Sequence, residues 1–317
     1  MINLRYHIVS LVAVFLALGM GIVMGSTVID RVTVDALSNK LDDVRKSVDA
    51  IRQENSRLDG QVKQDQQFAE STRDDLLKGH LKGVPVLVVA VAGVDRKPID
   101  DLRAALVTAQ ATVEGTVWFT SKMRLANDSD TKALATALDL PVDRPDVVRR
   151  QALAKVAAAR DAGATDAGPL AALSAAGFVT YDGPPPATST TVSPPSTLGP
   201  TLASVPLAGT RYILVSGAGA EVGDDLVGVP LAQALVQASA RVVAAESGTD
   251  TGQGGRAVFV GLLRSDVVSA RLSTVDNLES PMGQTATVLA VEDLAVPRFG
   301  QYGVGPGAQR ILPTPAT

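Results

Sequence analysis

The stretch VPVLVVAV, residues 84–91, is a continuous run of apolar and mostly β-branched side chains that ends at Ala92-Gly93. Runs of this kind are typical of strands that are buried on both faces, as in parallel sheets. An amphipathic helix is predicted for Ile99–Thr108, and a second strand for Thr112–Thr120. Strand, helix and strand in this order form a βαβ unit, so the stretch predicts an α/β fold.

The same alternation continues along most of the chain. Further helices are predicted for 130–138, 145–162, 170–176, 230–238, 265–270 and 281–294, and further strands for 178–181, 211–216, 240–245 and 257–262. Residues 300–317 are rich in Gly and Pro and are expected to form an extended tail. The predicted fold class is α/β: an N-terminal transmembrane helix and a coiled coil, followed by an open, mainly parallel α/β sheet domain.

One segment interrupts the α/β pattern. Residues 183–206, GPPPATSTTVSPPSTLGPTLASVP, are rich in Pro, Ser and Thr and show no hydrophobic period. We expect a linker or excursion loop over 183–207, between a first α/β half at 80–182 and a second half at 208–299. A structureless stretch of this length is unusual inside one compact domain, so it also suits a boundary between two half-domains.

The N-terminal region contains a membrane-length apolar run. Ile8–Val28, IVSLVAVFLALGMGIVMGSTV, carries no charge and meets the ~20 residues that a spanning helix needs. Arg5 on the short leading side favours a cytoplasmic N-terminus, with the rest of the chain outside the cytoplasm. The alternative is a cleaved signal peptide, but its apolar region usually has only ~7–15 residues. Residues 1–29 are therefore assigned to a short cytoplasmic tail and a signal-anchor helix of an envelope protein.

Two small motifs lie inside this run. Gly21 and Gly25 form a GxxxG pair, which allows two membrane helices to approach closely. Met20 and Met24 lie four residues apart on one helix face, and in a dimer their four sulfur atoms form a weak candidate site for copper(I). Packing of both methionines against lipid or a partner helix is the favoured interpretation.

A heptad pattern follows the membrane segment and predicts a coiled coil over 30–79. The a positions are Val34, Leu41, Val48, Asn55 and Val62, and the d positions are Leu37, Val44, Ile51 and Leu58. β-branched residues at a favour a parallel two-stranded coiled coil, and a polar Asn at a fixes register and strand number. Homodimerisation is expected, although a helix packed on its own domain or a heteromeric partner would also use these positions.

The composition excludes several kinds of function. The formal net charge is −4, with 29 basic and 33 acidic residues intermixed, so no concentrated basic surface for nucleic acid is expected. Cysteine is absent, and His7 and His80 are the two histidines. Neither histidine has a neighbour that would complete a nucleophile–base pair, so we expect no enzyme activity and no bound cofactor.

The loops offer weak site candidates. Glycines in SGAGAEVG (216–223) and GTDTGQGG (248–255) lack the spacing of nucleotide-binding motifs and are predicted to be turn glycines. Glu221, Asp224 and Asp225 have the oxygen chemistry to bind a hard cation, but exposed solvated acids are the favoured interpretation. Asp276 and Glu279, in STVDNLES, are predicted to be turn and capping residues.

Two stretches carry a family resemblance. They are MINLRYHIVSLVAVFLALGMGIVMGS (1–26), which leads into the coiled coil, and STVDNLESPMGQTATVLAVEDL (273–294), which is followed by GQYGVGPGAQRILP (300–313). Together with the α/β texture between them, they resemble the actinobacterial MctB copper transporter family over nearly the whole chain. The resemblance implies a pore-forming protein of the outer membrane, with copper as the transported ion. It supplies no ligand motif that can be matched to residues here.

An alternative hypothesis is a structural role. A short tail, one membrane helix, a coiled coil and an extracytoplasmic domain are also the layout of scaffolds or regulators of cell-wall hydrolase and cell-division complexes. Such a protein would bind a cell-wall or division partner. A periplasmic enzyme is the weakest hypothesis, because no acid–base or nucleophile pair stands out.

Overall fold

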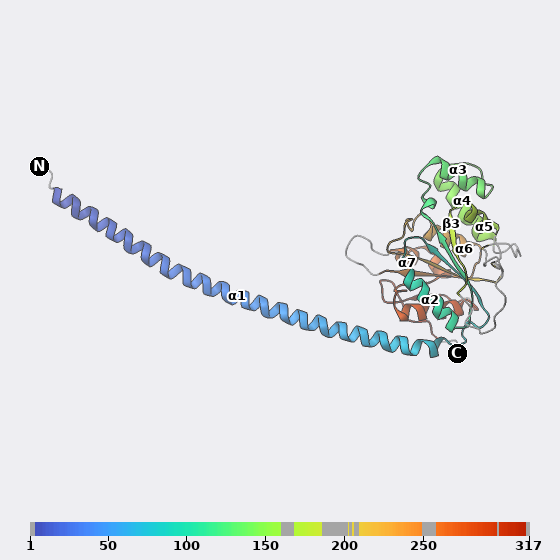
Figure 1. The fold of residues 1–317 in the computed structure, drawn as a ribbon, viewed down its shortest axis with the longest axis horizontal. Coiled ribbons are helices and arrows are strands. Elements are labelled where there is room, and N and C mark those ends of the chain that lie inside the picture. Colours follow the sequence, from blue (N-terminus) through green and yellow to red (C-terminus); the bar gives the residue numbers. More distant parts are fainter. Residues whose placement is uncertain are drawn as a thin grey trace. The chain divides into compact units, whose positions relative to one another are not determined.

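The computed structural model describes residues 4–159, 168–185, 202, 205, 209–248, 258–296 and 298–314, with side chains described at 5–25 and from 37 onward. The chain divides into two compact units, residues 1–65 and 66–317. The first unit is the main part of one helix, α1 (Leu4–Leu77), and the second unit contains the end of α1 and the α/β domain (Figure 1).

Helix α1 covers both the predicted membrane segment and the predicted coiled-coil segment. Within it, Arg5–Gly25 is long and apolar enough to cross a membrane, with a mean hydropathy of 2.5. This span agrees with the predicted anchor at 8–28 to within a few residues. The helical state of 30–77 agrees with the heptad pattern, whereas pairing with a second helix stays a prediction.

The domain is built on a seven-stranded sheet. Its strands are β1 (Pro85–Val91), β2 (Thr112–Phe119), β3 (Val179–Asp182), β4 (Arg211–Gly217), β5 (Val242–Ser247), β6 (Ser273–Val275) and β7 (Gln301–Tyr302). Their order is β3-β2-β1-β4-β5-β6-β7, and every pair is parallel except β2–β3. The predicted open, mainly parallel α/β sheet is therefore confirmed. Because β1 pairs with β4, both sequence halves belong to one sheet.

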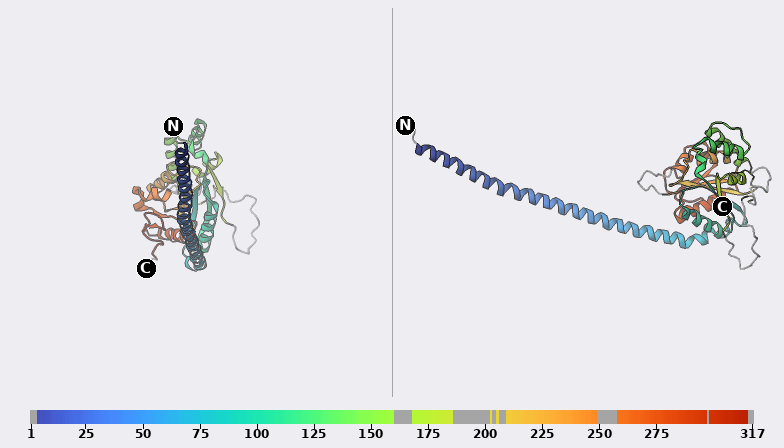
Figure 2. Two further views of the ribbon diagram at one scale, coloured as in Figure 1. Left: turned by 90° about the vertical axis from the view of Figure 1, so that its left-hand side faces the viewer. Right: turned by 45° about the horizontal axis from the view of Figure 1, so that its top comes forward.

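Helices cover both faces of the sheet (Figures 1 and 2). Helices α2 (Arg96–Thr108) and α8 (Pro281–Asp293) pack on one face. The other face is covered by α3 (Asp128–Ala137), α4 (Pro145–Ala158), α5 (Gly168–Ala175), α6 (Gly228–Gln237) and α7 (Phe259–Arg264). Two short 3₁₀ helices, η1 (Ser121–Arg124) and η4 (Val267–Arg271), complete this layer.

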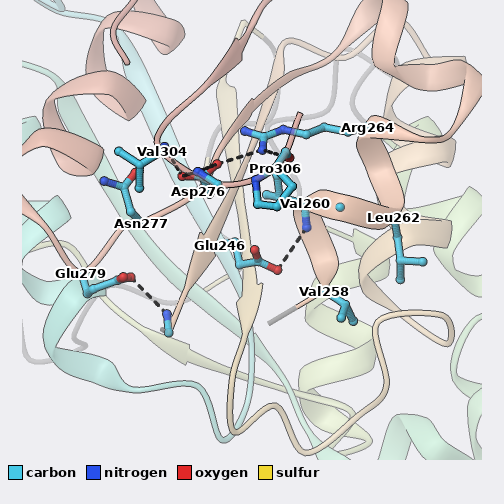
Figure 3. Close-up of a pocket in the computed structure, with 13 residues that line it drawn as sticks. Glu246, Val258, Val260, Leu262, Arg264, Asp276, Asn277, Glu279, Val304 and Pro306 are labelled. Atoms are coloured by element: carbon cyan, nitrogen blue, oxygen red, sulfur yellow. Dashed lines mark hydrogen bonds and ion pairs between the residues drawn. The ribbon is translucent and has the colours of Figure 1, made fainter. Parts of the chain in front are cut away.

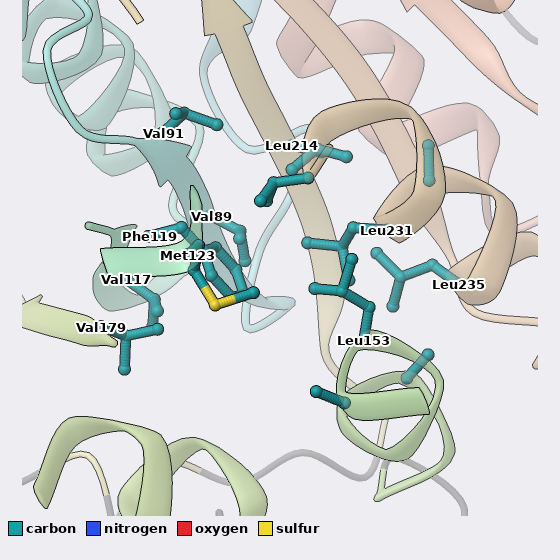
Figure 4. Close-up of a cluster of buried hydrophobic side chains, with 14 of the residues drawn as sticks. Val89, Val91, Val117, Phe119, Met123, Leu153, Val179, Leu214, Leu231 and Leu235 are labelled. Atoms are coloured by element: carbon teal, nitrogen blue, oxygen red, sulfur yellow. The ribbon is translucent and has the colours of Figure 1, made fainter. Parts of the chain in front are cut away.

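Alternation along the central strand explains the two cores. Leu87, Val89 and Val91 of β1 point into the core under α3–α7, part of which is drawn in Figure 4. The intervening Val86, Val88 and Ala90 point into the core under α2 and α8. A strand with apolar residues on both faces needs helices on both faces, so VPVLVVAV required this layered fold.

The end of α1 belongs to the domain. Leu77 and the following Leu81 are fully buried in the core under α2 and α8. Arg73 Nη1 donates to Gln284 Oε1 at 3.0 Å, and Leu81 N donates to Ala109 O at 2.9 Å. The compact unit that contains the α/β domain begins at Gln66 and so includes the last residues of α1.

Three corrections concern the region before α8, and a fourth concerns the C-terminal tail. The strand predicted at 257–262 is wrong, because Phe259–Arg264 is helix α7. The helix predicted at 265–270 is the 3₁₀ helix η4, displaced to 267–271, and β6 lies where only turn residues were expected. The tail beyond residue 300 is not simply extended, because it supplies β7 to the sheet.

Two predicted loops lie mainly outside the described residues. Of the segment at 183–207, the structure describes 183–185, Leu202 and Val205. Leu202 and Val205 are buried in the core under α3–α7. Of GTDTGQGG, only Gly248 is described.

Candidate functional site

A cleft of about 550 Å³ lies at the carboxyl ends of β5 and β6 (Figure 3). Glu246 reaches it from the end of β5, and Asp276 and Glu279 reach it from the turn after β6. Arg264 of α7 and residues 304–306 of the C-terminal segment close its other side. We call it the carboxyl-end cleft. Loops at this edge are where α/β sheets usually bind ligands.

The cleft does not lie at the point where the strand order reverses, between β1 and β4. There the loops after the two strands pack directly together, with Glu221 N donating to Ala92 O at 2.7 Å. Gly93 and Gly219 have positive φ angles, and a Cβ on either would collide with the backbone of the other loop. Gly219 is a turn residue, as predicted for SGAGAEVG, and the backbones of the two loops are in direct contact at Gly93 and Gly219.

Arg264 and Asp276 form a buried ion pair at the cleft. The distance from Arg264 Nη1 to Asp276 Oδ2 is 2.8 Å, and the side chains are only 8% and 10% exposed. Arg264 also donates to Thr274 Oγ1 at 3.0 Å and to Tyr302 O at 2.7 Å. Because its donors are used within the protein, the guanidinium is positioned to hold structure rather than a ligand.

Asp276 fixes the C-terminal segment. Its Oδ1 accepts from Val304 N at 2.6 Å, and its Oδ2 accepts from Gly305 N at 3.0 Å. These contacts join the carboxylate to a segment 28 and 29 residues later in the chain, and the predicted turn or capping role stays a prediction. The pairing of Asp276 with Arg264 was not predicted from the sequence. Arg264 lies 12 residues earlier on α7, a helix that the sequence analysis did not predict.

Glu246 is the titratable group of the cleft that departs most from ordinary behaviour. Its side chain is 8% exposed, and its Oε1 accepts from Val260 N at 3.2 Å. Burial raises the pKa of Glu246 to about 7. Glu279 is more exposed, and its Oε2 accepts from Gly248 N at 3.1 Å. Sequence reasoning missed Glu246, although an acid at the end of an apolar strand is a usable signal.

The cleft offers proton exchange at Glu246 but no metal centre. Among the residues that the structure describes, no group of three or more His, Asp or Glu side chains is arranged to hold a metal ion. The lining around the carboxyls is apolar, with Val258, Leu262 and Val304 exposed at its edge. Soft metals such as copper(I) prefer sulfur and imidazole ligands, which the cleft lacks.

The acidic loop does not form a cation site either. Asp224 accepts from Ser216 Oγ at 2.5 Å, and burial raises the pKa of Asp224. Glu221 uses its backbone oxygen to accept from Arg124 Nε at 2.5 Å, and Asp225 is exposed. Asp225 and Glu221 are exposed, as the favoured interpretation of solvated acids requires, whereas Asp224 is half-buried and hydrogen-bonded within the protein.

The residues predicted for self-association lie on α1 and are exposed in the single chain. Met20 and Met24 are 68% and 74% exposed, and a Cβ added to Gly21 or Gly25 meets nothing within 4 Å. The exposed heptad residues are Leu37, Leu41, Val44, Val48, Ile51, Asn55, Leu58 and Val62. The side chain of Val34 lies outside the described set. In the described single chain, no other segment packs on these side chains.

Comparison with known proteins places the whole chain in one group. The family model described as "Copper transport outer membrane protein, MctB" matches residues 1–313. "Copper transporter MctB" of Mycobacterium tuberculosis is 26% identical over 330 residues, covering 98% of this chain and 99% of the relative. The protein of the same name from Mycobacterium leprae is 28% identical over 333 residues, again with 98% and 99% covered.

Proposed function

Because this chain belongs to the MctB family, we propose that it takes part in copper transport in the cell envelope. The observation that carries the proposal is the extent of the likeness. Relatives named as copper transporters are similar to 98% of the chain, which includes the apolar helix, the heptad region and the α/β domain together. The scaffold hypothesis has no comparable support.

In this proposal α1 anchors the protein and supplies the transport element. Arg5–Gly25 has the length and apolarity of a membrane span, and Arg5 at its start favours a cytoplasmic N-terminus. The α/β domain would then lie outside the cytoplasm. The family description names the outer membrane, whereas a helix with a cytoplasmic N-terminus would span the inner membrane, so our proposal is limited to the cell envelope.

Self-association follows from the apolar surface of α1. Leu41, Val48 and Leu58 are 50%, 38% and 44% exposed, and they repeat with the spacing of a coiled-coil interface. Burying such a stripe against a second copy is favourable by about 25 cal/mol per Å² of apolar surface. We therefore propose a parallel homodimer, with Asn55 setting its register.

Copper ligands are scarce in the described domain, so the proposed route lies along the paired α1 helices. Met20 and Met24 from two chains would present four thioether sulfurs inside the membrane span, and thioethers suit copper(I). The ion would be a transported substrate rather than a resident cofactor.

Complementation tests the proposed function. The chain is expressed in a mycobacterial strain that lacks its own MctB, and growth is scored over a series of copper and zinc concentrations. Restored tolerance to copper alone is the expected result. Growth no better than with empty vector would contradict a copper transport role.

Variants separate the route from the function. Met20→Leu/Met24→Leu should reduce copper tolerance while protein abundance stays unchanged. Met282→Leu, which changes a partly exposed methionine on α8, is the matched control and should behave as wild type. If the double variant restores full tolerance, the methionine route is wrong while copper transport stands.

A further inference from the structure

A row of arginines crosses the amino edge of the sheet, opposite the carboxyl-end cleft. The β4–β5 register pairs Tyr212 with Val242, and the β5–β6 register pairs Val243 with Ser273. Arg211 is the first residue of β4, Arg241 directly precedes β5, and Arg271 is the last residue of η4, two residues before β6, so all three lie at the amino ends of three adjacent strands. Neighbouring strands lie only about 4.8 Å apart, so three like charges start side by side.

Two arginines at this edge are held within the protein. Arg211 is 7% exposed, and its Nη1 donates to Val291 O at 2.6 Å, near the end of α8. Arg298, three residues before β7, pairs with Asp293 Oδ1 at 3.3 Å. Arg298 is therefore paired with a carboxylate, whereas Arg211 is hydrogen-bonded to a neutral carbonyl oxygen.

Arg241 and Arg271 have no such partner. Within the described ranges, neither side chain has a hydrogen bond or an ion pair with another residue. Both line a hollow of about 250 Å³ whose opposite wall includes Leu294, Ala295 and Phe299. Burial lowers the pKa of Arg211, the nearby charge of Arg241 lowers it further, and the charge of Glu292 raises it, so Arg241 lies close enough to Arg211 for the two positive charges to repel each other.

We propose that this hollow binds a phosphate group between the guanidinium groups of Arg241 and Arg271. A guanidinium presents a planar pair of donors that matches two phosphate oxygens, and a bound anion would relieve the repulsion between neighbouring arginines. The volume suits a phosphate with a small carbon substituent lying against Leu294 and Phe299. The proposal is independent of copper transport.

Titration of the full-length protein in zwitterionic detergent tests the site. Isothermal calorimetry with inorganic phosphate should show saturable binding to the wild type. Arg241→Gln and Arg271→Gln should each weaken it about tenfold or more, because each removes charge-assisted hydrogen bonds. Arg150→Gln, on α4, is the matched control and should bind as wild type. The proposal would be overturned if the wild type did not bind phosphate, or if both site variants bound phosphate as tightly as the wild type.

A stability measurement separates a ligand site from a structural role. In phosphate-free buffer, the Arg241→Gln/Arg271→Gln double variant should unfold at the same or a higher urea concentration than wild type, because like charges have been removed. Added phosphate should raise the Tm of the wild type but not of the double variant. A clear loss of stability without phosphate would mean that these arginines support the fold, and the phosphate site would be wrong.

Competition identifies the form of the ligand. If the phosphate belongs to an ester, as in a lipid headgroup, glycerol 1-phosphate should bind more tightly than inorganic phosphate by using the apolar wall. If the ligand is free phosphate, the order should reverse. Either order supports phosphate binding. If sulfate and chloride occupied the site as tightly as inorganic phosphate and glycerol 1-phosphate do, the proposal of a phosphate site would be contradicted.

Discussion

At the scale of single residues, buried charges at the carboxyl-end cleft dominate the behaviour of the domain. Arg264 and Asp276 are nearly inaccessible to solvent and depend on each other. Removing one member of such a pair leaves an uncompensated charge in a poorly solvated place. The cleft is therefore a sensitive part of the fold, although it is built from exposed loops.

Asp276→Ala should destabilise the domain by about 3–5 kcal/mol, because Arg264 loses its counter-ion and residues 304–305 lose their acceptor. Urea unfolding measures the change. Asp146→Ala is the control: it breaks an exposed pair with Arg150, at 3.4 Å, and should cost no more than about 1 kcal/mol. Equal losses in the two variants would show that the buried pair has no special role.

Glu246 should make stability depend on pH. Burial raises its pKa from 4.5 to about 7, so the folded state binds the proton more tightly than the unfolded chain. This contribution is fully present below about pH 4.5 and is lost as the pH rises through about 7. The free energy of unfolding of Glu246→Gln should exceed that of the wild type by up to about 3 kcal/mol at about pH 8. At about pH 4.5 the two free energies should differ little. Urea unfolding at both pH values tests this, and a pH-independent difference would contradict it.

Residue types were only a partial guide to this site. Asp276 was predicted as a turn residue, but the backbone N–H groups that its carboxylate accepts belong to Val304 and Gly305, 28 and 29 residues later in the chain. Its pairing with Arg264 and the burial of Glu246 arise from packing of α7 against β5 and β6. Such contacts between distant segments are not encoded in local pattern.

At the scale of elements, apolar runs identified the long or central helices and strands more reliably than the short peripheral ones. VPVLVVAV is long, β-branched and flanked by turn residues, so it was recognisable as a strand. The short run at 257–262 was also predicted as a strand, but its residues 259–262 belong to helix α7. Phe259, Val260 and Leu263 are buried while Val258 and Leu262 are 44% and 42% exposed, a helical spacing that a run of six apolar residues conceals.

The junction between α1 and the domain gives a prediction at this scale. Leu81→Ala should cost about 2–5 kcal/mol, because it opens a cavity in the core under α2 and α8. Leu58→Ala is the control, since Leu58 is 44% exposed on α1 and lies in the other compact unit. Thermal unfolding of the domain compares them. A Tm for Leu81→Ala equal to that of Leu58→Ala would mean that the end of α1 is not part of the core.

The heptad region of α1 gives a second prediction. The wild type should sediment as a dimer in detergent. Asn55→Leu should raise the Tm at which the associated helices melt. It should also yield a mixture of dimers and larger species, because a buried Asn at an a position limits strand number. Analytical ultracentrifugation distinguishes these states. A wild type that stays monomeric at every concentration would rule out the proposed homodimer.

At the scale of the whole molecule, the chain combines an apolar helix, a heptad segment and an α/β domain that lacks metal-ligand clusters in its described residues. The phosphate site at the amino edge of the sheet is our separate proposal for the domain. The order of these parts along the chain could be predicted from the sequence. Which residues meet in the carboxyl-end cleft and which meet at the amino edge of the sheet depends on the strand order, which the sequence pattern does not give.

Copper content per cell is the most direct test of the central claim. It is measured by mass spectrometry in the mycobacterial strain that lacks its own MctB, with and without this chain, at one external copper concentration. We predict lower cellular copper when the chain is present, with zinc unchanged. Equal copper in the two strains, with the protein detected in the envelope, would contradict a role in copper transport.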